Sequence, residues 1–364
     1  MKLLLAADIF PPQSGGPATY VVTLANELSK QGDIVRIVSL NPKSDKSAAA
    51  CSVRHVTSSN KLFRYLQYFW LLFWEAKNVE VVYAMGPVNA GLPGLIVARL
   101  LGKKFVVKVV GDYAWEQFQN SSKSDIMVDE FQKLKIGGKI GILKLIEAFV
   151  VKNADLVITP SVYLKNIVLG WGAKEGKVSV VYNAVSKLDI TPKSKPSNER
   201  WIVSAGRLVP WKGMMVLLKI INENFLGTET KLKIIGDGPE YSNLSREVKK
   251  MHLENSVELV GSLSHTDALS YIRSADVFLL NSGYEGLSHV ILEAKNFGVP
   301  VLASEVGGNP ELVSSEFLFP YNNSEIIKQK IKTIIDNPKN ISFNDEKFSL
   351  EAMITNTKKL LSGI

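Results

Sequence analysis

The length, composition and charge of the chain are those of a folded protein with two domains. Its 364 residues are enough for two hydrophobic cores, 46% apolar against 21% charged residues exclude a disordered chain, and the single cysteine, Cys51, excludes an internal disulfide framework. Residues 1–187 hold 23 Lys and Arg against 14 Asp and Glu, within a net charge of +8 for the whole chain, so the first half is expected to meet something anionic.

The excess of basic residues in the first half of the chain indicates which kinds of partner molecule it could bind. Anionic lipid headgroups, a lipid-linked phosphate or an acidic glycan would each suit a basic first half, and a generally basic solvated surface is the alternative. Nucleic acid is not expected, because the sequence holds no recognition module or basic–aromatic repeat. The cysteine usage, the opening without a signal-peptide pattern and the lack of an apolar run that could span a bilayer predict a cytoplasmic protein, open to association with a membrane surface.

Buried strands and helices alternate through the first half of the chain. Apolar runs of strand length are separated by longer helical patterns, and repeated units of this kind require a parallel sheet with right-handed crossovers. The expected fold class is therefore α/β with doubly wound, Rossmann-like domains. The predicted strands span residues 2–7, 34–40, 79–83, 105–110, 155–159 and 178–182, and the predicted helices span 18–30, 62–77, 90–101, 142–152 and 163–169.

A loop at 10–17 joins the first strand to the first helix. Its adjacent glycines, Gly15 and Gly16, let the backbone come close to a ligand at the start of the helix, as in the phosphate-binding loops of doubly wound domains. Two glycines are also common in ordinary turns, so a plain turn is the alternative. The loop does not match the G-x-G-x-x-G pattern of dinucleotide-binding folds.

The predicted helix at 62–77 is crowded with aromatic residues. Lys61 and Arg64 lie at its start, and its aromatic residues together occupy most of its faces: Phe63, Tyr65, Tyr68, Phe69, Trp70, Phe73 and Trp74. An aromatic stripe usually belongs to a core. Aromatic residues on most faces, with basic residues at one end, also suit a membrane surface, and both interpretations stay open.

The strand at 105–110 ends in a polar corner. Ligands bind off the carboxyl ends of parallel strands, so Asp112 is a candidate polar contact, and a loop-capping Asp is the alternative. Residues 117–141 are polar and glycine-rich and predict a loop on the acceptor side of the site. A segment rich in Lys, Pro and Ser at 188–199 predicts a linker. The expected organisation is a first domain at 1–187, the linker, a second domain at 200–342, and a C-terminal helix at 343–364 that can pack back on the first domain.

The second half restarts the pattern with a cationic loop. After a strand at 200–204, Arg207 and Lys212 lie five residues apart and are framed by Gly206 and Gly213. An Arg fork and a Lys point charge at this spacing can clamp a diphosphate, and a solvated charge pair is the alternative. The next strand, at 231–235, ends in a tight loop that contains Gly238.

A strand–loop–helix–strand unit at 277–302 carries two carboxylates. Glu285 precedes the helix and Glu293 lies two turns inside it. Amide groups at a helix start can bind phosphate or sugar oxygens, so Gly286, Leu287 and Ser288 are candidate ligand contacts beside Glu285. The alternative is an acidic residue that complements the helix dipole, together with one exposed helix Glu.

The E-x7-E spacing of Glu285 and Glu293 resembles that of the retaining GT-B glycosyltransferases of family 4, which include sucrose synthases and mannosyltransferases. The resemblance runs over nearly the whole chain and extends to the loops at 10–17, 206–213 and 236–239. It implies a GT-B fold, in which two Rossmann-like domains with parallel sheets face each other across a cleft.

The resemblance also implies roles for single residues. In the family, the first Glu of the pair faces the donor sugar and the second holds the nucleotide ribose, which assigns these roles to Glu285 and Glu293. Arg207 and Lys212 correspond to the pair that stabilises the leaving nucleoside diphosphate. The glycines expected close to the donor are Gly15, Gly16, Gly206, Gly238 and Gly286.

One position departs from the family pattern. Many relatives carry a His that contacts the transferred sugar where this chain has Gly111, which leaves Asp112 as the candidate in the first domain. The four histidines lie far apart in the sequence, and no metal-binding motif is present. We therefore expect neither a metal nor a cofactor, with a UDP-sugar or GDP-sugar as donor substrate.

The expected function is a metal-independent, retaining transfer of a sugar from a nucleotide-diphosphate sugar. The acceptor would be a glycan or a lipid-linked molecule in bacterial-type surface polysaccharide or glycolipid synthesis. Two alternatives stay open: a nucleotide-sugar 2-epimerase of the same fold, and a catalytically inactive nucleotide-sugar-binding subunit, the latter because of Gly111.

Overall fold

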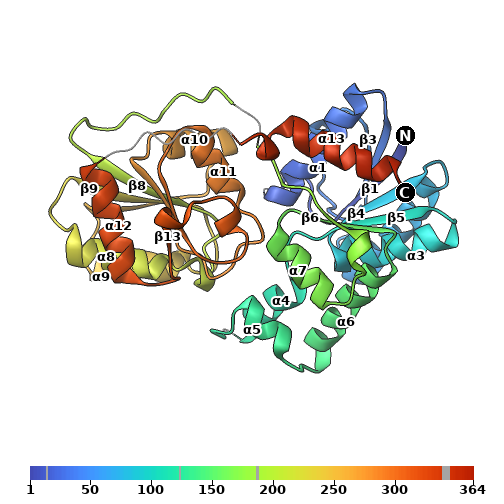
Figure 1. Cartoon of the computed structure of the whole chain (residues 1–364), viewed down its shortest axis with the longest axis horizontal. Coiled ribbons are helices and arrows are strands. Elements are labelled where there is room, and N and C mark those ends of the chain that lie inside the picture. The colour runs from blue at the N-terminus through green and yellow to red at the C-terminus, as the bar shows by residue number, and fades with distance from the viewer. Residues whose placement is uncertain (14, 123, 186–187, 338–344) are drawn as a thin grey trace. The chain divides into compact units, whose positions relative to one another are not determined.

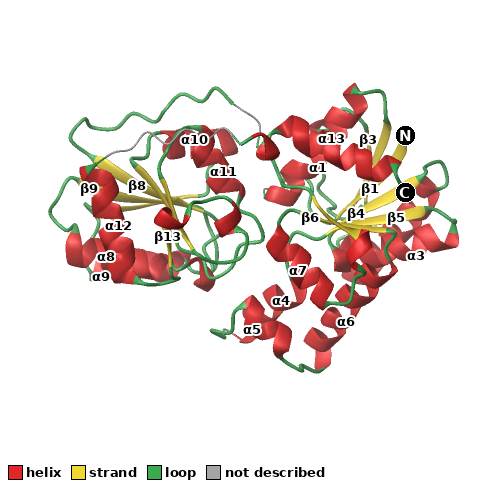
Figure 2. Cartoon of the chain, in the orientation of Figure 1, coloured by secondary structure: helices red, strands yellow, loops and turns green. Residues whose placement is uncertain are grey.

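The structure is a computed structural model that describes residues 1–13, 15–122, 124–185, 188–337 and 345–364. Contacts divide the chain into two compact units (Figure 1). The first unit consists of Met1–Asn183 together with Ser349–Ile364, and the second of Ala184–Phe348. Each unit is an α/β domain with its own parallel sheet (Figure 2).

The first unit is built on a parallel sheet whose described strands follow the order β3-β2-β1-β4-β5-β6-β7. Strand β1 is buried on both faces, which explains its nearly continuous apolar sequence. The strands are β1 (Lys2–Ala7), β2 (Ile34–Ser39), β3 (Ser52–His55), β4 (Val81–Met85), β5 (Lys104–Lys108), β6 (Leu156–Thr159) and β7 (Val178–Val180). The edge strand β3 is not among the strands expected from the sequence.

Helices cover both faces of this sheet. The apolar inner sides of α2, α3 and α6 share one core with the sheet, while α1 and α13 lie along its other side (Figure 1). The helices of this unit are α1 (Gly16–Lys30), α2 (Lys61–Ala76), α3 (Leu92–Leu100), α4 (Tyr113–Ser122), α5 (Val128–Lys133), α6 (Gly138–Asn153), α7 (Val162–Gly170) and α13 (Leu350–Ser362).

The last helix, α13, belongs to the first unit, where it packs beside α1. Thr357 is fully buried there, and the Lys358 ammonium lies 2.8 Å from the Asp33 carboxylate and donates to Gln31 at 3.0 Å. Asp33 also pairs with the amino group of Met1. The start of the helix that we expected at 343 lies outside the described residues, as does the boundary at 342.

A buried cation lies in the interior of the first unit. Lys108, at the end of β5, is 1% exposed, and its ammonium lies 3.9 Å from the centre of the Tyr20 ring. It has no hydrogen-bond partner among the described residues. Burial lowers the pKa of Lys108 to about 7.

The expectation of a loop over 117–141 is wrong. This region forms the end of α4, all of α5 and the start of α6. Residue 123 lies outside the described residues. The segment is polar, but its Phe131 is fully buried, and the indole of Trp115, which is fully buried just before the segment, donates to the Ile126 carbonyl at 3.0 Å. Tertiary burial of a few aromatic side chains thus outweighs a composition typical of loops.

The second unit repeats the architecture with the strand order β10-β9-β8-β11-β12-β13 among its described residues. Helices α8, α9 and α12 pack on one core with the sheet. The strands are β8 (Arg200–Ala205), β9 (Thr230–Ile235), β10 (Val257–Gly261), β11 (Val277–Leu280), β12 (Val301–Ser304) and β13 (Leu318–Phe319). The helices are α8 (Met214–Asn224), α9 (Tyr241–Lys250), α10 (His265–Arg273), α11 (His289–Asn296) and α12 (Ser324–Asp336).

The segment expected to be a linker, 188–199, packs on the second unit. The Lys195 ammonium lies 2.5 Å from the Asp276 carboxylate, and the Ser274 hydroxyl donates to the Lys193 carbonyl at 2.8 Å. Residues 186–187, where the first domain was expected to end, lie outside the described residues. Across the described parts of the chain, no helix has both the length and the apolar character needed to cross a membrane.

Candidate functional site

The strand order of the second sheet reverses between β8 and β11, which run side by side and parallel. In doubly wound sheets, ligands bind at such a reversal, beyond the carboxyl ends of the strands. Two loops leave the sheet there: 206–213 after β8 and 281–288 after β11. These loops hold most of the site residues that the sequence predicts.

Backbone and side-chain hydrogen bonds join the two loops. The Gly283 amide donates to the Trp211 carbonyl at 2.6 Å, and the Asn281 side chain donates to the Gly213 carbonyl at 3.1 Å. Gly213 has a φ of 58° and is closely surrounded by Asn281, so a side chain there would be strained and crowded. The two loops are therefore held together at one edge of the sheet of the second unit.

An ion pair connects the two loops at their polar side. The Lys212 ammonium lies 2.5 Å from Glu285 Oε1, and the two side chains are only 15% and 12% exposed. The Ser282 hydroxyl donates to the same Oε1 at 2.7 Å. The structure thus brings together two residues that the sequence assigns to different parts of a donor.

Arg207 behaves differently from Lys212. Its side chain is exposed, and within the described residues it forms no ion pair or side-chain hydrogen bond. The clamp expected from the spacing therefore consists of one paired cation, Lys212, and one solvent-facing cation, Arg207. A phosphate could recruit the latter without breaking an existing contact.

Two glycines, the predicted Gly238 and its neighbour Gly236, allow close backbone packing around the cationic loop. A Cβ on Gly238 would lie 2.4 Å from the Leu208 carbonyl oxygen, and one on Gly236 would lie 2.0 Å from that of Gly206. The Leu208 amide donates to the Asp237 carbonyl at 2.9 Å. Gly236 and Gly238 thus allow the Arg207–Lys212 loop to lie on the 236–239 loop, whereas a Cβ on Gly206 would meet only the Lys212 side chain, at 3.7 Å.

A second glycine pair supports the Glu285 loop. Gly307 has a φ of 56°, and a Cβ there would lie 1.9 Å from the Glu285 carbonyl oxygen. The Gly308 amide donates to that same carbonyl at 3.0 Å. Gly286, Leu287 and Ser288 are buried and lead directly into α11.

Glu293 lies on α11 and contacts a residue that was not expected at the site from the sequence. Its carboxylate is 2.8 Å from Nε2 of His265, the first residue of α10. The hydrogen bond to Glu293 raises the pKa of His265. No local pattern points to this pair, since only the packing of α10 beside α11 brings the two residues together.

The predicted residues of the first unit lie at the corresponding edge of its own sheet. The loop after β1 carries Gly15 and Gly16 to the start of α1, and Gly15 is exposed with a φ of 139°. Asp8 follows β1 directly, and burial raises its pKa. Asn89 donates to the Asp8 carboxylate at 3.4 Å and accepts from the Tyr65 hydroxyl at 2.7 Å. Asp8 and Asn89 are polar residues at this edge that were not expected from the sequence.

Asp112 is 1% exposed and caps a helix. Its carboxylate accepts from the Trp115 amide and the Gln132 side chain, both at 2.7 Å, at the start of α4. Glu147, also 1% exposed, accepts from the Tyr113 amide at 2.8 Å. Burial raises the pKa of both Asp112 and Glu147. This geometry fits the capping interpretation of Asp112.

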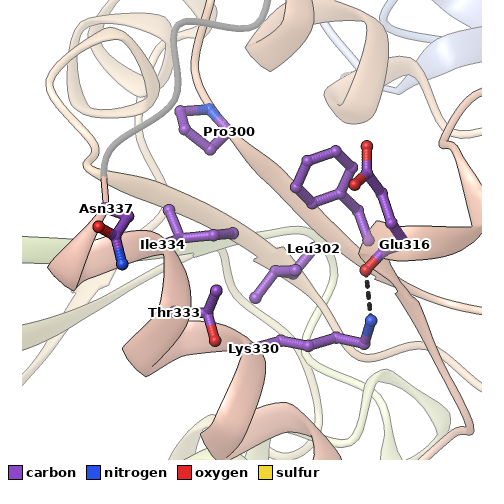
Figure 3. A pocket seen from close by; sticks show the side chains of 8 residues that line it. Pro300, Leu302, Glu316, Lys330, Thr333, Ile334 and Asn337 are labelled. Carbon is purple, nitrogen blue, oxygen red and sulfur yellow. Dashed lines mark hydrogen bonds between the residues drawn. The ribbon is translucent and has the colours of Figure 1, made fainter.

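The second unit also holds a cavity away from the loops described above. This cavity, of about 200 Å³, lies between β12 and α12, where Lys330 donates to the Glu316 carbonyl (Figure 3). It is lined by none of the predicted site residues. Within the described residues, no cluster of three or more His, Cys, Asp or Glu side chains could hold a metal ion.

Comparisons with known proteins place the chain in a family. Residues 14–187 match the family described as Glycosyltransferase Family 4, and residues 186–359 match Glycosyl transferases group 1. The amylovoran biosynthesis glycosyltransferase AmsD of Erwinia amylovora is 27% identical over 92% of this chain and 90% of its own length. The GPI3 subunit of phosphatidylinositol N-acetylglucosaminyltransferase from Saccharomyces cerevisiae is 24% identical over 86% of this chain and 70% of its own length.

The solved structures agree on the fold. The crystal structure of Anabaena HepE in complex with UDP-glucose superposes over the full length of both chains with a TM-score of 0.79 at 19% identity. A sucrose-phosphate synthase from Thermosynechococcus elongatus gives a TM-score of 0.79 over 100% of this chain and 98% of that one, also at 19% identity. With two parallel-sheet units, paired cationic and acidic loops at the strand reversal, and both family matches, the chain is a GT-B glycosyltransferase that belongs to family 4, the glycosyl transferases group 1.

Proposed function

We propose that this glycosyltransferase moves a sugar from a nucleotide-diphosphate sugar, with retention of anomeric configuration and without a metal ion, to a glycan or lipid-linked acceptor. The observation that carries the proposal is the Lys212–Glu285 ion pair at the strand reversal of the second sheet, beside the exposed Arg207. The cations there suit a diphosphate, and the carboxylate suits sugar hydroxyls.

The cations have a specific task in this reaction. Cleavage of the bond between sugar and phosphate develops negative charge on the diphosphate, which positioned cations stabilise more strongly than they stabilise the bound donor. Lys212 is held by Glu285 at 2.5 Å, and Arg207 is free to fork onto a phosphate. These two cations would supply, in part, the stabilisation that a metal ion provides in other transferases.

The carboxylates suit the other parts of the donor. Glu285 Oε1 is occupied by Lys212 and Ser282, which leaves Oε2 to accept a hydrogen bond from a sugar hydroxyl. Glu293, 13% exposed and paired with His265, is proposed to accept from a ribose hydroxyl. The amides of Gly286, Leu287 and Ser288 at the start of α11 are proposed to meet donor oxygens.

The relatives support a class of acceptor. One is named for amylovoran biosynthesis and another for transfer to phosphatidylinositol, and the structural neighbour HepE was crystallised with UDP-glucose. On this basis we propose surface polysaccharide or glycolipid synthesis, with a UDP-sugar or GDP-sugar as donor. The proposed place of action is the cytoplasm, at an anionic membrane surface, in keeping with the basic first half of the chain.

A panel of radiolabelled UDP- and GDP-sugars, incubated with the protein and a lipid extract, tests the proposal. We expect transfer to the extract with full activity in EDTA, and retained anomeric configuration in the product by NMR. Release of a rearranged free sugar, or binding with no reaction, would contradict the proposal.

Variants of the two cations connect this activity to the site. Arg207→Ala or Lys212→Ala should lower kcat roughly 100-fold to 1000-fold, as loss of one charge-stabilising group costs about 3–4 kcal/mol of barrier. Lys219→Ala, on the exposed side of α8, is the matched control and should retain activity. Activity of both site variants within threefold of the wild type would show that this pair does not carry the reaction.

A further inference from the structure

Three neighbouring helices of the first unit, α2, α3 and α6, expose large apolar side chains on their outer sides. Their inner sides share one core with the sheet, and α3 contacts both α2 and α6, so the outer sides form one continuous surface, here called the three-helix face. Soluble proteins rarely expose a large contiguous apolar surface without a binding role. The site in the second unit does not account for this surface.

Helix α2 supplies an apolar stripe. Leu62, Leu66, Trp70 and Trp74 recur every four residues, so they lie in a row, and Trp74 is 59% exposed. The sequence leaves open whether the aromatic residues of this helix belong to the core or to a surface. The structure divides them: Tyr68 is fully buried, while the two tryptophans of the stripe face outward.

Helices α3 and α6 extend the stripe. Leu100 at the end of α3 is 65% exposed, and Leu145 on α6 is 70% exposed. Ile142 and Phe149 flank Leu145 at helical spacing and are also exposed. At the start of α6, Ile142 and Leu145 line an open hollow of about 580 Å³, which Lys135 and Lys144 also line.

The charges on the three-helix face are of one sign. These helices are described in full and hold two acidic residues, Glu75 and Glu147; Glu75 is paired with Arg36, and Glu147 is buried. The exposed charged side chains of α2, α3 and α6 are therefore basic: Lys61 at the start of α2, Lys139 near the start of α6, and Arg99 at the end of α3, which pairs with Asp155 at 3.2 Å. At the end of α2, the Lys77 ammonium lies 3.7 Å from the centre of the Trp74 ring.

We propose that the three-helix face is a docking surface for an anionic lipid bilayer. Tryptophan beside lysine suits the boundary between acyl chains and headgroups, because the ring enters the apolar region while the ammonium stays with the phosphates. The lysines Lys61 and Lys139, which form no ion pair within the described residues, complement anionic headgroups. The inference rests on the proposed function in one respect: docking would place the enzyme where a lipid-linked acceptor resides.

Cosedimentation of the full chain with vesicles tests the docking. Vesicles of phosphatidylcholine mixed with phosphatidylglycerol should bind the protein, and vesicles of phosphatidylcholine alone should bind it far more weakly. Binding should fall steeply as salt rises above about 0.1 M, where charges are screened beyond about 10 Å. Equal binding to both kinds of vesicle, or none to the anionic kind at low salt, would overturn the proposal.

Variants locate the surface. Trp70→Gln with Trp74→Gln on α2, and separately Leu145→Gln with Phe149→Gln on α6, should each weaken vesicle binding roughly tenfold or more, since each removes exposed apolar side chains. Leu226→Gln, which changes an exposed leucine of the second unit, is the matched control and should bind as the wild type does. Unchanged binding of both double variants would refute the assignment.

Two further measurements distinguish lipid docking from self-association and from damage to the nucleotide site. Sedimentation velocity without lipid should give the same species for the wild type and the double variants; a dimer that the variants abolish would assign the face to a second copy of the chain and overturn the proposal. Nucleoside diphosphate binding should be unchanged in the double variants. Loss of vesicle binding with intact nucleotide binding therefore concerns docking alone, and a failed donor panel with intact vesicle binding concerns the proposed function alone.

Discussion

The ion pair between Lys212 and Glu285 allows a quantitative prediction. Its two side chains are 15% and 12% exposed, and their charged atoms lie 2.5 Å apart. Exposed pairs contribute about 0.2–1 kcal/mol, and breaking a fully buried pair costs about 3–5 kcal/mol. A pair of intermediate exposure should therefore show a coupling of about 1–3 kcal/mol in the free energy of unfolding.

A double-mutant cycle measures this coupling. Urea unfolding would be compared for the wild type, Lys212→Met, Glu285→Gln and the double variant, without donor. We expect each single variant to lose stability and the double variant to lose clearly less than the sum of the two. Lys219→Met and Glu254→Gln, exposed residues of the same unit without a partner across the loops, form the control cycle and should be additive.

The prediction would be refuted if the effects of Lys212→Met and Glu285→Gln on the free energy of unfolding were additive. If the coupling between Lys212 and Glu285 falls below about 0.5 kcal/mol, the usual limit for independent sites, the contact contributes nothing to the order of the two loops. Glu285 would then have no role in positioning Lys212 for a diphosphate, even if both residues matter for turnover.

Four more expectations concern contacts described above. Glu285→Gln should tighten binding of a free nucleoside diphosphate by about 1 kcal/mol, roughly fivefold, because the Lys212 ammonium no longer pairs with a carboxylate. Calorimetry measures this affinity, and weaker binding by the variant would contradict the expectation. Asp112→Ala should lower the free energy of unfolding by about 1–3 kcal/mol through loss of a buried cap, whereas Asp112→Asn should lose less and keep kcat, and a large loss of kcat in Asp112→Asn at wild-type stability would restore a catalytic role. The hydrogen bond to Glu293 raises the pKa of His265. The pair therefore stabilises the fold at pH values below the ordinary pKa of His, and this contribution is lost as pH rises through the raised pKa. Glu293→Gln should lower the pKa of His265 in an NMR titration. Burial lowers the pKa of Lys108 to about 7, so above that pH the unfolded chain binds more protons than the folded chain. The free energy of unfolding should therefore rise from pH 7 toward the ordinary pKa of Lys, by up to about 1.4 kcal/mol per pH unit. Lys108→Met should flatten this rise in urea unfolding at a series of pH values.

The sequence predicts the repeating architecture because parallel strands buried on both faces leave a plain signal. The strand expected at 2–7 coincides with β1, and the other expected strands differ from the structure at their ends by one or two residues. The family resemblance adds the GT-B fold, which the structure and the solved neighbours confirm. The local sequence pattern and the family resemblance agree on the fold because both reflect the same alternation of buried strands and helices along the chain.

Contacts between distant loops could not be predicted from local pattern. Lys212 and Glu285 are 73 residues apart, and nothing in either loop indicates that β8 and β11 are neighbours in the sheet. The pair of His265 and Glu293 was missed for the same reason. The error over 117–141 has another cause, since buried aromatic side chains, Phe131 within the segment and Trp115 just before it, fix helices where the composition is typical of a loop.

The contacts of Glu285 also bear on how the proposed transfer would proceed. A carboxylate that attacks a sugar carbon needs an oxygen with its electron pairs available. Oε1 of Glu285 already accepts from the Lys212 ammonium at 2.5 Å and from the Ser282 hydroxyl at 2.7 Å, and both contacts stabilise the negative charge and so weaken the carboxylate as a nucleophile. Oε2, which has no hydrogen bond within the described residues, shares that charge. Glu285 is therefore suited to accept a hydrogen bond from a sugar hydroxyl and to hold Lys212 in place, rather than to form a covalent intermediate. Without such an intermediate, retention of the anomeric configuration would require the acceptor to attack from the face that the diphosphate leaves.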